Sequence, residues 1–233
     1  MDTAADGAVI VLLPGSASDG FMFTRTLSSL GSRLRMISFT VPALWDPYAL
    51  ARGFKTVIDH LDLPPVIVVG SSFGAYWGPF VALSFPKQVR KLLIGNGFVD
   101  ASDLAGNALF DRARIEAISP AELKSEWLAR IDAAPASELK VLQHFMLAGK
   151  SPESLHAHFL AVVRARACPL LPLADSNVTV LDCEDDPVIP AAARQRVRAQ
   201  YPNGCHITFM NGGHYPHILN SAAYEELLLR VAS

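Results

Sequence analysis

Short apolar runs alternate with helical patterns along much of the chain. The runs predict strands at about residues 8–13, 35–39, 65–71, 91–96, 177–181 and 205–210. Between the second and third runs, Leu50, Phe54 and Ile58 recur at helical spacing and predict an amphipathic helix over residues 48–61. The alternation predicts an α/β fold with a doubly wound, mostly parallel sheet and right-handed crossovers.

The pattern changes between residues 98 and 175. No strand-like run occurs there, and Ala, Leu, Glu and Arg dominate. The starts Ser119-Pro120-Ala121-Glu122 and Ser151-Pro152-Glu153 each combine an N-cap residue, a proline at the first helical position and an acid in the first turn. We therefore expect a core of residues 1–97 and 176–233, and a helical cap of residues 98–175 with three or four helices, acting as a lid.

The third apolar run ends in Gly-x-Ser-x-Gly, at Gly70 to Gly74, and a helix that reaches about Phe85 follows. This arrangement predicts a sharp strand-to-helix turn, a nucleophile elbow, with Ser72 at its apex in a strained backbone conformation. The two glycines are expected because the close approach of neighbouring chain leaves almost no room for a side chain. Ser72 is the predicted nucleophile.

A serine hydroxyl needs a base to accept its proton, and the base needs an acid to hold its tautomer. Asp186 and His214 each follow a predicted strand, at the sheet edge where open α/β sheets build their sites. The order Ser72, Asp186, His214 matches the order nucleophile, acid, histidine that α/β-hydrolases present. We therefore predict a catalytic triad of these three residues.

Neighbouring residues compete for two of these roles. Asp186 is favoured over Asp185 because an acid directly before a proline, here Pro187, is the pattern associated with the triad acid; Asp185 stays the alternative. His214 is favoured over His217 because the two glycines before it let the loop bring the imidazole over the serine. His217 is instead predicted to line the substrate pocket.

Two backbone amides are candidate donors to an oxyanion. Ser16 follows the first strand, where such hydrolases place one donor, although Pro-Gly-Ser is also an ordinary turn sequence. Phe73 follows the nucleophile at the start of a helix, where its amide is free. The aromatic candidates for pocket walls, which would otherwise be plain core residues, are Phe21, Trp45, Trp77 and Phe98.

Composition excludes several other classes of protein. The chain has 233 residues, of which 51% are hydrophobic and 18% charged, so it is long and apolar enough to bury a large core and is not a disordered chain. The formal net charge of −2, with scattered Lys and Arg, argues against a nucleic-acid partner. The acidic start and the short first apolar run predict no signal sequence or membrane span, and hence a cytoplasmic protein.

The metal-ligating residue types do not form a recognisable site. Cys168, Cys183 and Cys205 are widely spaced in apolar surroundings and are expected to be reduced core thiols rather than disulfide partners or zinc ligands. His156 and His158 are two residues apart, whereas a shared ligand face on a helix needs a spacing of three or four. We expect no metal and no cofactor.

Several stretches are similar to maspardin-like proteins. The similarity covers residues 35–46, 57–63 and 70–74, and returns at 201–203 and 211–216; the helical insertion resembles them only vaguely. It implies an α/β-hydrolase fold. Because triad positions have drifted in some maspardin-like proteins, it also implies a binding or adaptor role for some members.

This chain keeps an acid at Asp186 and a histidine at His214, which favours catalysis. The leading hypothesis is a serine hydrolase acting on a small-molecule ester or thioester of a mainly apolar acyl group. The alternatives are a non-catalytic adaptor on the same fold, or a biosynthetic enzyme that uses the triad for acyl transfer, cyclisation or C–C hydrolysis. A homodimer is left open.

Overall fold

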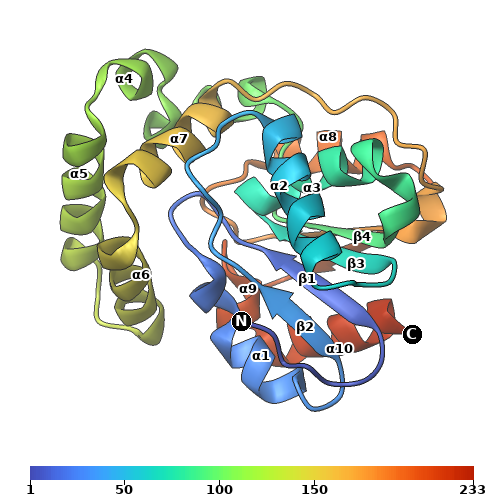
Figure 1. Ribbon diagram of the computed structural model, residues 1–233. Coiled ribbons are helices and arrows are strands. Elements are labelled where there is room, and N and C mark those ends of the chain that lie inside the picture. The colour runs from blue at the N-terminus through green and yellow to red at the C-terminus, as the bar shows by residue number, and fades with distance from the viewer.

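Six strands form one sheet in the computed structural model, which describes residues 1–233 (Figure 1). They are β1 (Val9–Leu13), β2 (Arg35–Ser38), β3 (Val66–Ser71), β4 (Val89–Gly95), β5 (Val178–Cys183) and β6 (Cys205–Phe209). Their spatial order is β2-β1-β3-β4-β5-β6, and every neighbouring pair is parallel. The predicted parallel sheet is confirmed.

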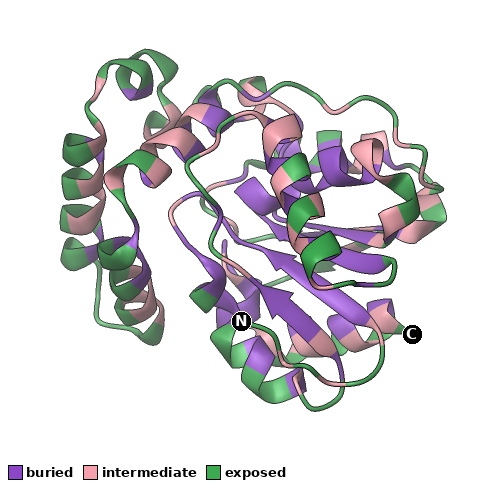
Figure 2. Cartoon of the chain, viewed as in Figure 1, coloured by how far each residue is buried: buried purple, intermediate pink, exposed green.

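Helices cover both faces of this sheet. Figure 1 shows α2 (Pro47–His60), α3 (Phe73–Ser84) and α8 (Ala191–Gln200) on one side, and α1 (Thr24–Leu30), α9 (Pro216–Leu219) and α10 (Ser221–Ala232) on the other. Alternate strand residues point to opposite faces. Val11 and Val68 accordingly belong to the cluster under α2 and α3, whereas Leu12 and Val69 belong to the cluster under α1 and α10. The strands are therefore buried on both faces, except at one edge (Figure 2).

That exposed edge is β6, which only β5 pairs. Its residues are exposed or half-buried. Cys205 lies on it and is exposed, so the expectation that all three cysteines are core thiols is wrong at this position. Cys183 is buried, Cys168 is half-buried, and none of the three forms a disulfide.

Between β4 and β5 the chain forms helices and no strand, as expected. These are α4 (Arg112–Ala117), α5 (Pro120–Ala133), α6 (Glu138–Gly149) and α7 (Pro152–Val163). The predicted helix starts are present: Ser119 and Glu122 form a reciprocal capping box, and the Ser151 hydroxyl accepts a hydrogen bond from the Ser154 amide. The helices share a hydrophobic cluster of their own around Phe159. The boundaries of a cap at residues 98 and 175 stay a prediction.

The strand order fixes where a site is built. The chain leaves β1 toward β2 on one side and places β3 on the other side, so the loops after β1 and β3 diverge at this point of the sheet. The register pairs Leu13 with Gly70, which brings the two loops side by side. Open α/β sheets bind ligands at such switch points.

Candidate active site

Ser72 occupies a strained turn between β3 and α3. Its backbone has φ 54° and ψ −114°, a region that side chains other than glycine rarely adopt. A Cβ at Gly70 would collide with the carbonyl of Gly74, and a Cβ at Gly74 would collide with the carbonyl of Leu13. The two flanking glycines are thus required by backbone packing, for the reason the sequence predicted.

Asp186 and His214 meet in the loops after β5 and β6. The His214 Nδ1 atom lies 2.9 Å from Asp186 Oδ2 and 3.1 Å from Oδ1. His214 is 7% exposed, and the Asp186 side chain is fully buried. The Nε2 atom of His214 makes no hydrogen bond within the protein. A carboxylate on Nδ1 favours the tautomer that leaves Nε2 available as a base.

The Asp186 carboxylate is held in its ionised form. Its Oδ1 atom accepts hydrogen bonds from the amides of Val188, at 2.7 Å, and Ile189, at 3.1 Å. Burial by itself raises the pKa of Asp186, but the hydrogen bond and charge of His214, with these two amides, outweigh it and hold the pKa below 3.8. A buried anion is therefore available to stabilise an imidazolium.

Asp185, the alternative acid, contacts the same loop in a different way. It accepts hydrogen bonds from the amides of Gly213, at 2.8 Å, and Gly212, at 3.3 Å. Both glycines have positive φ, 54° and 147° respectively. Asp185 therefore shapes the loop that carries His214, whereas Asp186 contacts the imidazole itself.

Ser72 and His214 line one small cavity of about 40 Å³. Its walls come from the turn after β1, the elbow, the segment between β4 and β5, and the two loops that carry Val188 and His214. The full lining is Gly15, Ser16, Ala17, Ser18, Met22, Ser71, Ser72, Leu109, Phe110, Trp127, Phe159, Val188, His214 and Tyr215. No hydrogen bond joins Ser72 to His214, a contact that in apo structures often forms only when substrate binds.

Of the two candidate oxyanion donors, Ser16 lines this cavity, whereas Phe73 does not line it but directly follows Ser72, which does. Ser18 donates to the Gly15 carbonyl through its amide, at 3.3 Å, and its hydroxyl, at 3.1 Å, which closes a turn with Ser16 and Ala17 at its centre. The amide of Ser16 donates to no protein acceptor. Phe73 is the first residue of α3, where an amide has no intrahelical acceptor.

The aromatic residues predicted as pocket walls do not line the cavity. Trp77 is buried beside Phe54 and Phe73 in the core, and Phe98 is stacked on Tyr76. These two belong to the packing of α3.

The other two lie on the surface. Phe21 is 44% exposed and packs edge-on against Phe145, and Trp45 is 50% exposed beneath the guanidinium of Arg164. Phe21 lies in a short 3-10 helix (Gly20–Phe23) and Trp45 in a loop. The aromatic or cationic neighbour of each comes from the helical segment, which sequence periodicity does not reveal.

His217 also lies outside the cavity lining. It is 1% exposed on α9, enclosed by the rings of Phe23, Tyr215 and Tyr224. Neither ring nitrogen has a hydrogen-bond partner. Burial lowers the pKa of His217 to about 3, so the ring is neutral at ordinary pH.

Sequence reasoning did not single out Asn96, which joins the loops of the site. It follows β4 with a positive φ of 46° and is 1% exposed. Its Nδ2 donates to the Gly213 carbonyl at 3.0 Å, and its Oδ1 accepts from the Cys183 amide at 3.1 Å. The sequence signal that could have identified Asn96 is its position as a polar residue directly after a buried strand.

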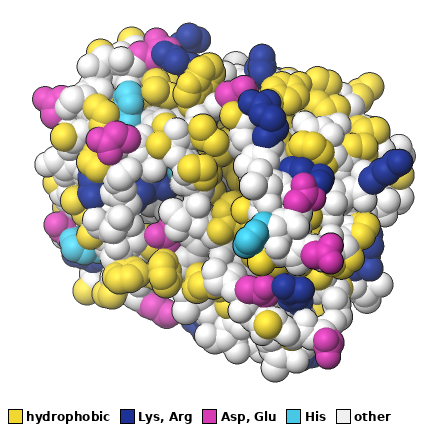
Figure 3. Space-filling model, in the orientation of Figure 1, with side chains coloured by type: hydrophobic (Ala, Val, Ile, Leu, Met, Phe, Trp, Pro, Cys, Tyr) yellow, Lys and Arg dark blue, Asp and Glu magenta, His cyan; other side chains and the backbone are white.

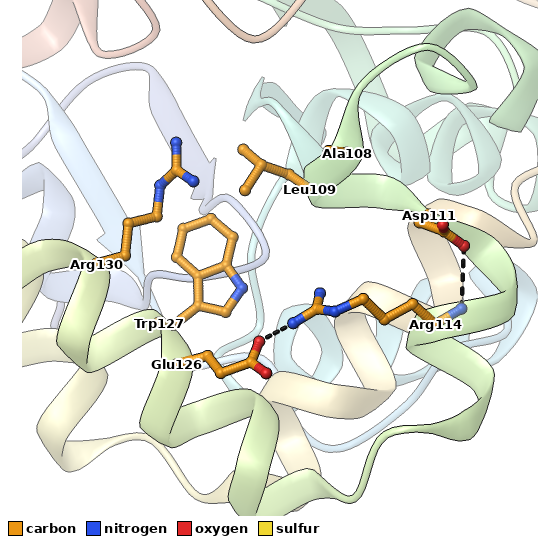
Figure 4. A pocket seen from close by; sticks show the side chains of 7 residues that line it. All are labelled: Ala108, Leu109, Asp111, Arg114, Glu126, Trp127 and Arg130. Atoms are coloured by element: carbon orange, nitrogen blue, oxygen red, sulfur yellow. Dashed lines mark hydrogen bonds and ion pairs between the residues drawn. The ribbon is translucent and has the colours of Figure 1, made fainter.

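A second, larger cleft of about 400 Å³ adjoins the cavity and shares Leu109 and Trp127 with it. Figure 4 shows the Trp127 ring from α5 between the guanidinium groups of Arg114 and Arg130. Arg114 is paired with Glu126, whereas Arg130 lies over the Trp127 ring at 5.9 Å. Leu109 and Trp127 thus separate the inner cavity from the cleft.

Charge, metal-ligating residues and helix length bear on three other classes of site. Figure 3 shows basic and acidic side chains interspersed on the face it presents. No group of three or more His, Cys, Asp and Glu residues is placed to hold a metal ion. None of the helices combines the length and apolar character needed to cross a membrane.

Comparison with known proteins places this geometry in context. A model of the alpha/beta hydrolase family matches residues 10–227. Maspardin from Danio rerio is 26% identical over 236 residues, covering 92% of this chain and 70% of that protein; maspardin from Homo sapiens is 25% identical over 221 residues, covering 92% and 71%. An esterase from Exiguobacterium antarcticum superposes with a TM-score of 0.79 at 18% identity, covering 97% of this chain and 92% of that one. That likeness concerns the fold alone.

Proposed function

Because the chain belongs to the alpha/beta hydrolase family, we propose that it is a serine hydrolase that cleaves an ester or thioester of a mainly apolar acyl group. The observation that carries the proposal is the buried Asp186–His214 pair at the cavity that Ser72 also lines. The apolar lining around that cavity, which includes Met22 and Phe159, supports an apolar acyl group.

In the proposed reaction, Ser72 attacks the carbonyl carbon and His214 Nε2 accepts the hydroxyl proton. Asp186 holds the His214 tautomer and offsets the charge of the imidazolium. The amides of Ser16 and Phe73 donate to the oxyanion, each contributing on the order of 3 kcal/mol to lowering the barrier. His214 then protonates the leaving group, and water hydrolyses the acyl-enzyme by the same path.

The cavity restricts how substrate reaches the serine. It is small, about 40 Å³, and Leu109 and Trp127 separate it from the outer cleft. We propose that these two residues open toward the outer cleft when substrate enters. The helical segment between β4 and β5 would then act as a lid.

A fluorophosphonate probe and a series of p-nitrophenyl esters test the proposal. The expected result is labelling at Ser72 that disappears in Ser72→Ala, and turnover that is lost in the same variant. Circular dichroism of both proteins verifies that the variant is folded.

A second function, non-catalytic binding, is favoured by the small size of the cavity at Ser72. The maspardin relatives agree with such a role. Absence of both labelling and turnover across acyl lengths would select this function, whereas labelling with negligible ester turnover would indicate a biosynthetic use of the triad.

A further inference from the structure

Lys150 is a buried lysine directly after α6. It is 4% exposed, which is rare for a lysine without a carboxylate directly bound to it. Its Nζ atom donates to the carbonyl of Ser18 at 2.9 Å, and its own backbone carbonyl accepts from Lys124 Nζ at 2.7 Å. The helical segment thus inserts a cation into the core beside the turn after β1.

The atom that Lys150 contacts belongs to the turn that carries the candidate oxyanion donor. Ser18 is the last residue of that turn, and its amide and hydroxyl are both bonded to Gly15. With the Ser18 carbonyl held by the ammonium, every polar group of this residue is fixed. The amide of Ser16, at the centre of the turn, donates to no protein acceptor, and Ser16 lines the cavity.

We propose that Lys150 is a positioning residue that holds the turn Gly15–Ser18 so that the Ser16 amide is aimed at the oxyanion. The inference rests on the proposed hydrolase function. It assigns Lys150 no proton transfer and no contact with substrate. Its contribution is to hold the Ser16 amide in place before the transition state forms. Without it, the turn would have to rearrange during the reaction, which would raise the barrier.

The charged surroundings of Lys150 give this role a pH dependence. Burial lowers the pKa of Lys150 to about 8, against an opposing attraction from Asp19. Burial raises the pKa of Asp19 above 3.8, and burial, together with the charge on Lys150, lowers that of His158 to about 3. The other cation near Lys150 is Lys124, which lies on α5 and donates to the Lys150 carbonyl. Among Asp19, Lys150 and His158, only the ammonium loses its charge on the alkaline side.

The test compares Lys150→Met with Lys140→Met by steady-state hydrolysis of p-nitrophenyl acetate from pH 6 to 9.5, corrected for spontaneous hydrolysis. Lys140 is a matched control because it lies on α6, the helix that Lys150 follows, and also donates to backbone carbonyls, those of Asp132 and Ala134. We expect kcat of Lys150→Met to fall about 10- to 100-fold with KM nearly unchanged, which is the signature of a lost transition-state interaction.

The pH profile separates this role from a merely structural one. In the wild type, kcat is expected to decline above about pH 8, whereas the residual rate of Lys150→Met has no such decline. Lys150→Arg, whose charge does not titrate, is expected to recover most of the rate and to stay flat to pH 9.5.

The outcomes are distinguishable. A wild-type kcat that is flat across pH 8, or a Lys150→Met rate equal to that of Lys140→Met, overturns the inference and leaves the hydrolase proposal standing. A wild type with no turnover and no labelling of Ser72 overturns both. If Lys150→Met does not fold, the profiles of the wild type and Lys150→Arg decide the question.

Discussion

Replacing Asp186 with asparagine tests the proposed triad with almost no change in shape. The carboxylate accepts three contacts: the amides of Val188 and Ile189, and Nδ1 of His214. An asparagine oxygen still accepts from the two amides, but its NH₂ group then faces Nδ1 and requires a lone pair there. The imidazole proton moves to Nε2, the nitrogen that has to accept the serine proton. For the same exchange in a Ser-His-Asp protease the loss is about 10⁴-fold, or about 5 kcal/mol at 1.36 kcal/mol per factor of ten.

Asp185→Asn is the matched control for this prediction. Its two oxygens accept separately from the amides of Gly212 and Gly213, so an asparagine keeps the shorter bond, to Gly213, and loses the longer one. Because Asp185 does not contact the imidazole, we expect a loss in kcat/KM of less than about tenfold. The measurement is kcat/KM for p-nitrophenyl acetate at pH 7.5, with circular dichroism to verify the fold of each variant. If Asp186→Asn keeps more than a tenth of the wild-type value, or if Asp185→Asn loses more than Asp186→Asn, the assignment of Asp186 is refuted.

Three further predictions concern stability and access. In the wild type, His217 has a pKa of about 3 when folded and about 6.5 when unfolded. Its contribution to stability is therefore complete above pH 6.5 and falls by up to about 1.4 kcal/mol per pH unit toward pH 3. His217→Phe removes this titrating group. Urea unfolding gives the free energy of unfolding at pH 7 and at pH 4.5. We expect it to fall between these two pH values by about 2 to 3 kcal/mol less in His217→Phe than in the wild type, and equal falls would contradict the reasoning. Gly74→Ala forces a Cβ into the Leu13 carbonyl and is expected to lower Tm by more than 10 °C or prevent folding; a Tm within 3 °C of wild type would show that the turn relaxes. Trp127→Ala opens the cavity to the outer cleft and is expected to raise the rate on hexanoyl relative to acetyl p-nitrophenyl ester several-fold, and an unchanged ratio would exclude Trp127 as the barrier.

The sheet could be predicted because its signal is local. Val9–Leu13 and Val66–Ser71 are largely apolar on both faces. This pattern is typical of a strand that helices cover on both sides. The elbow could be predicted for a similar reason, since Gly70 and Gly74 are dictated by backbone within a few residues. For the edge strand β6, the strand itself was predicted, but its exposure was not. Exposure depends on which segments pack against the strand, which its own sequence does not show.

The surroundings of Ser72 could not be predicted because they depend on packing between distant segments. Trp127 and Phe159 line the cavity, whereas Trp77 and Phe98 lie in the core, and no sequence pattern distinguishes the two pairs. Which face of each helix turns toward the serine depends on how α5 and α7 pack. Lys150 was missed for the same reason, since a lysine after a helix is ordinarily a surface residue.

The position of the helical segment in the chain affects how new specificities arise. It leaves from β4 and returns at β5, which are adjacent parallel strands, so they can pair with any segment long enough to cross back from the end of β4 to the start of β5. Evolution or a protein engineer is therefore free to exchange this segment as a cassette while Ser72, Asp186 and His214 stay on the retained scaffold. A transplanted segment has to replace the contacts that this one makes with the scaffold, among them the hydrogen bonds of Lys150 to the Ser18 carbonyl and of His158 to the Pro42 carbonyl.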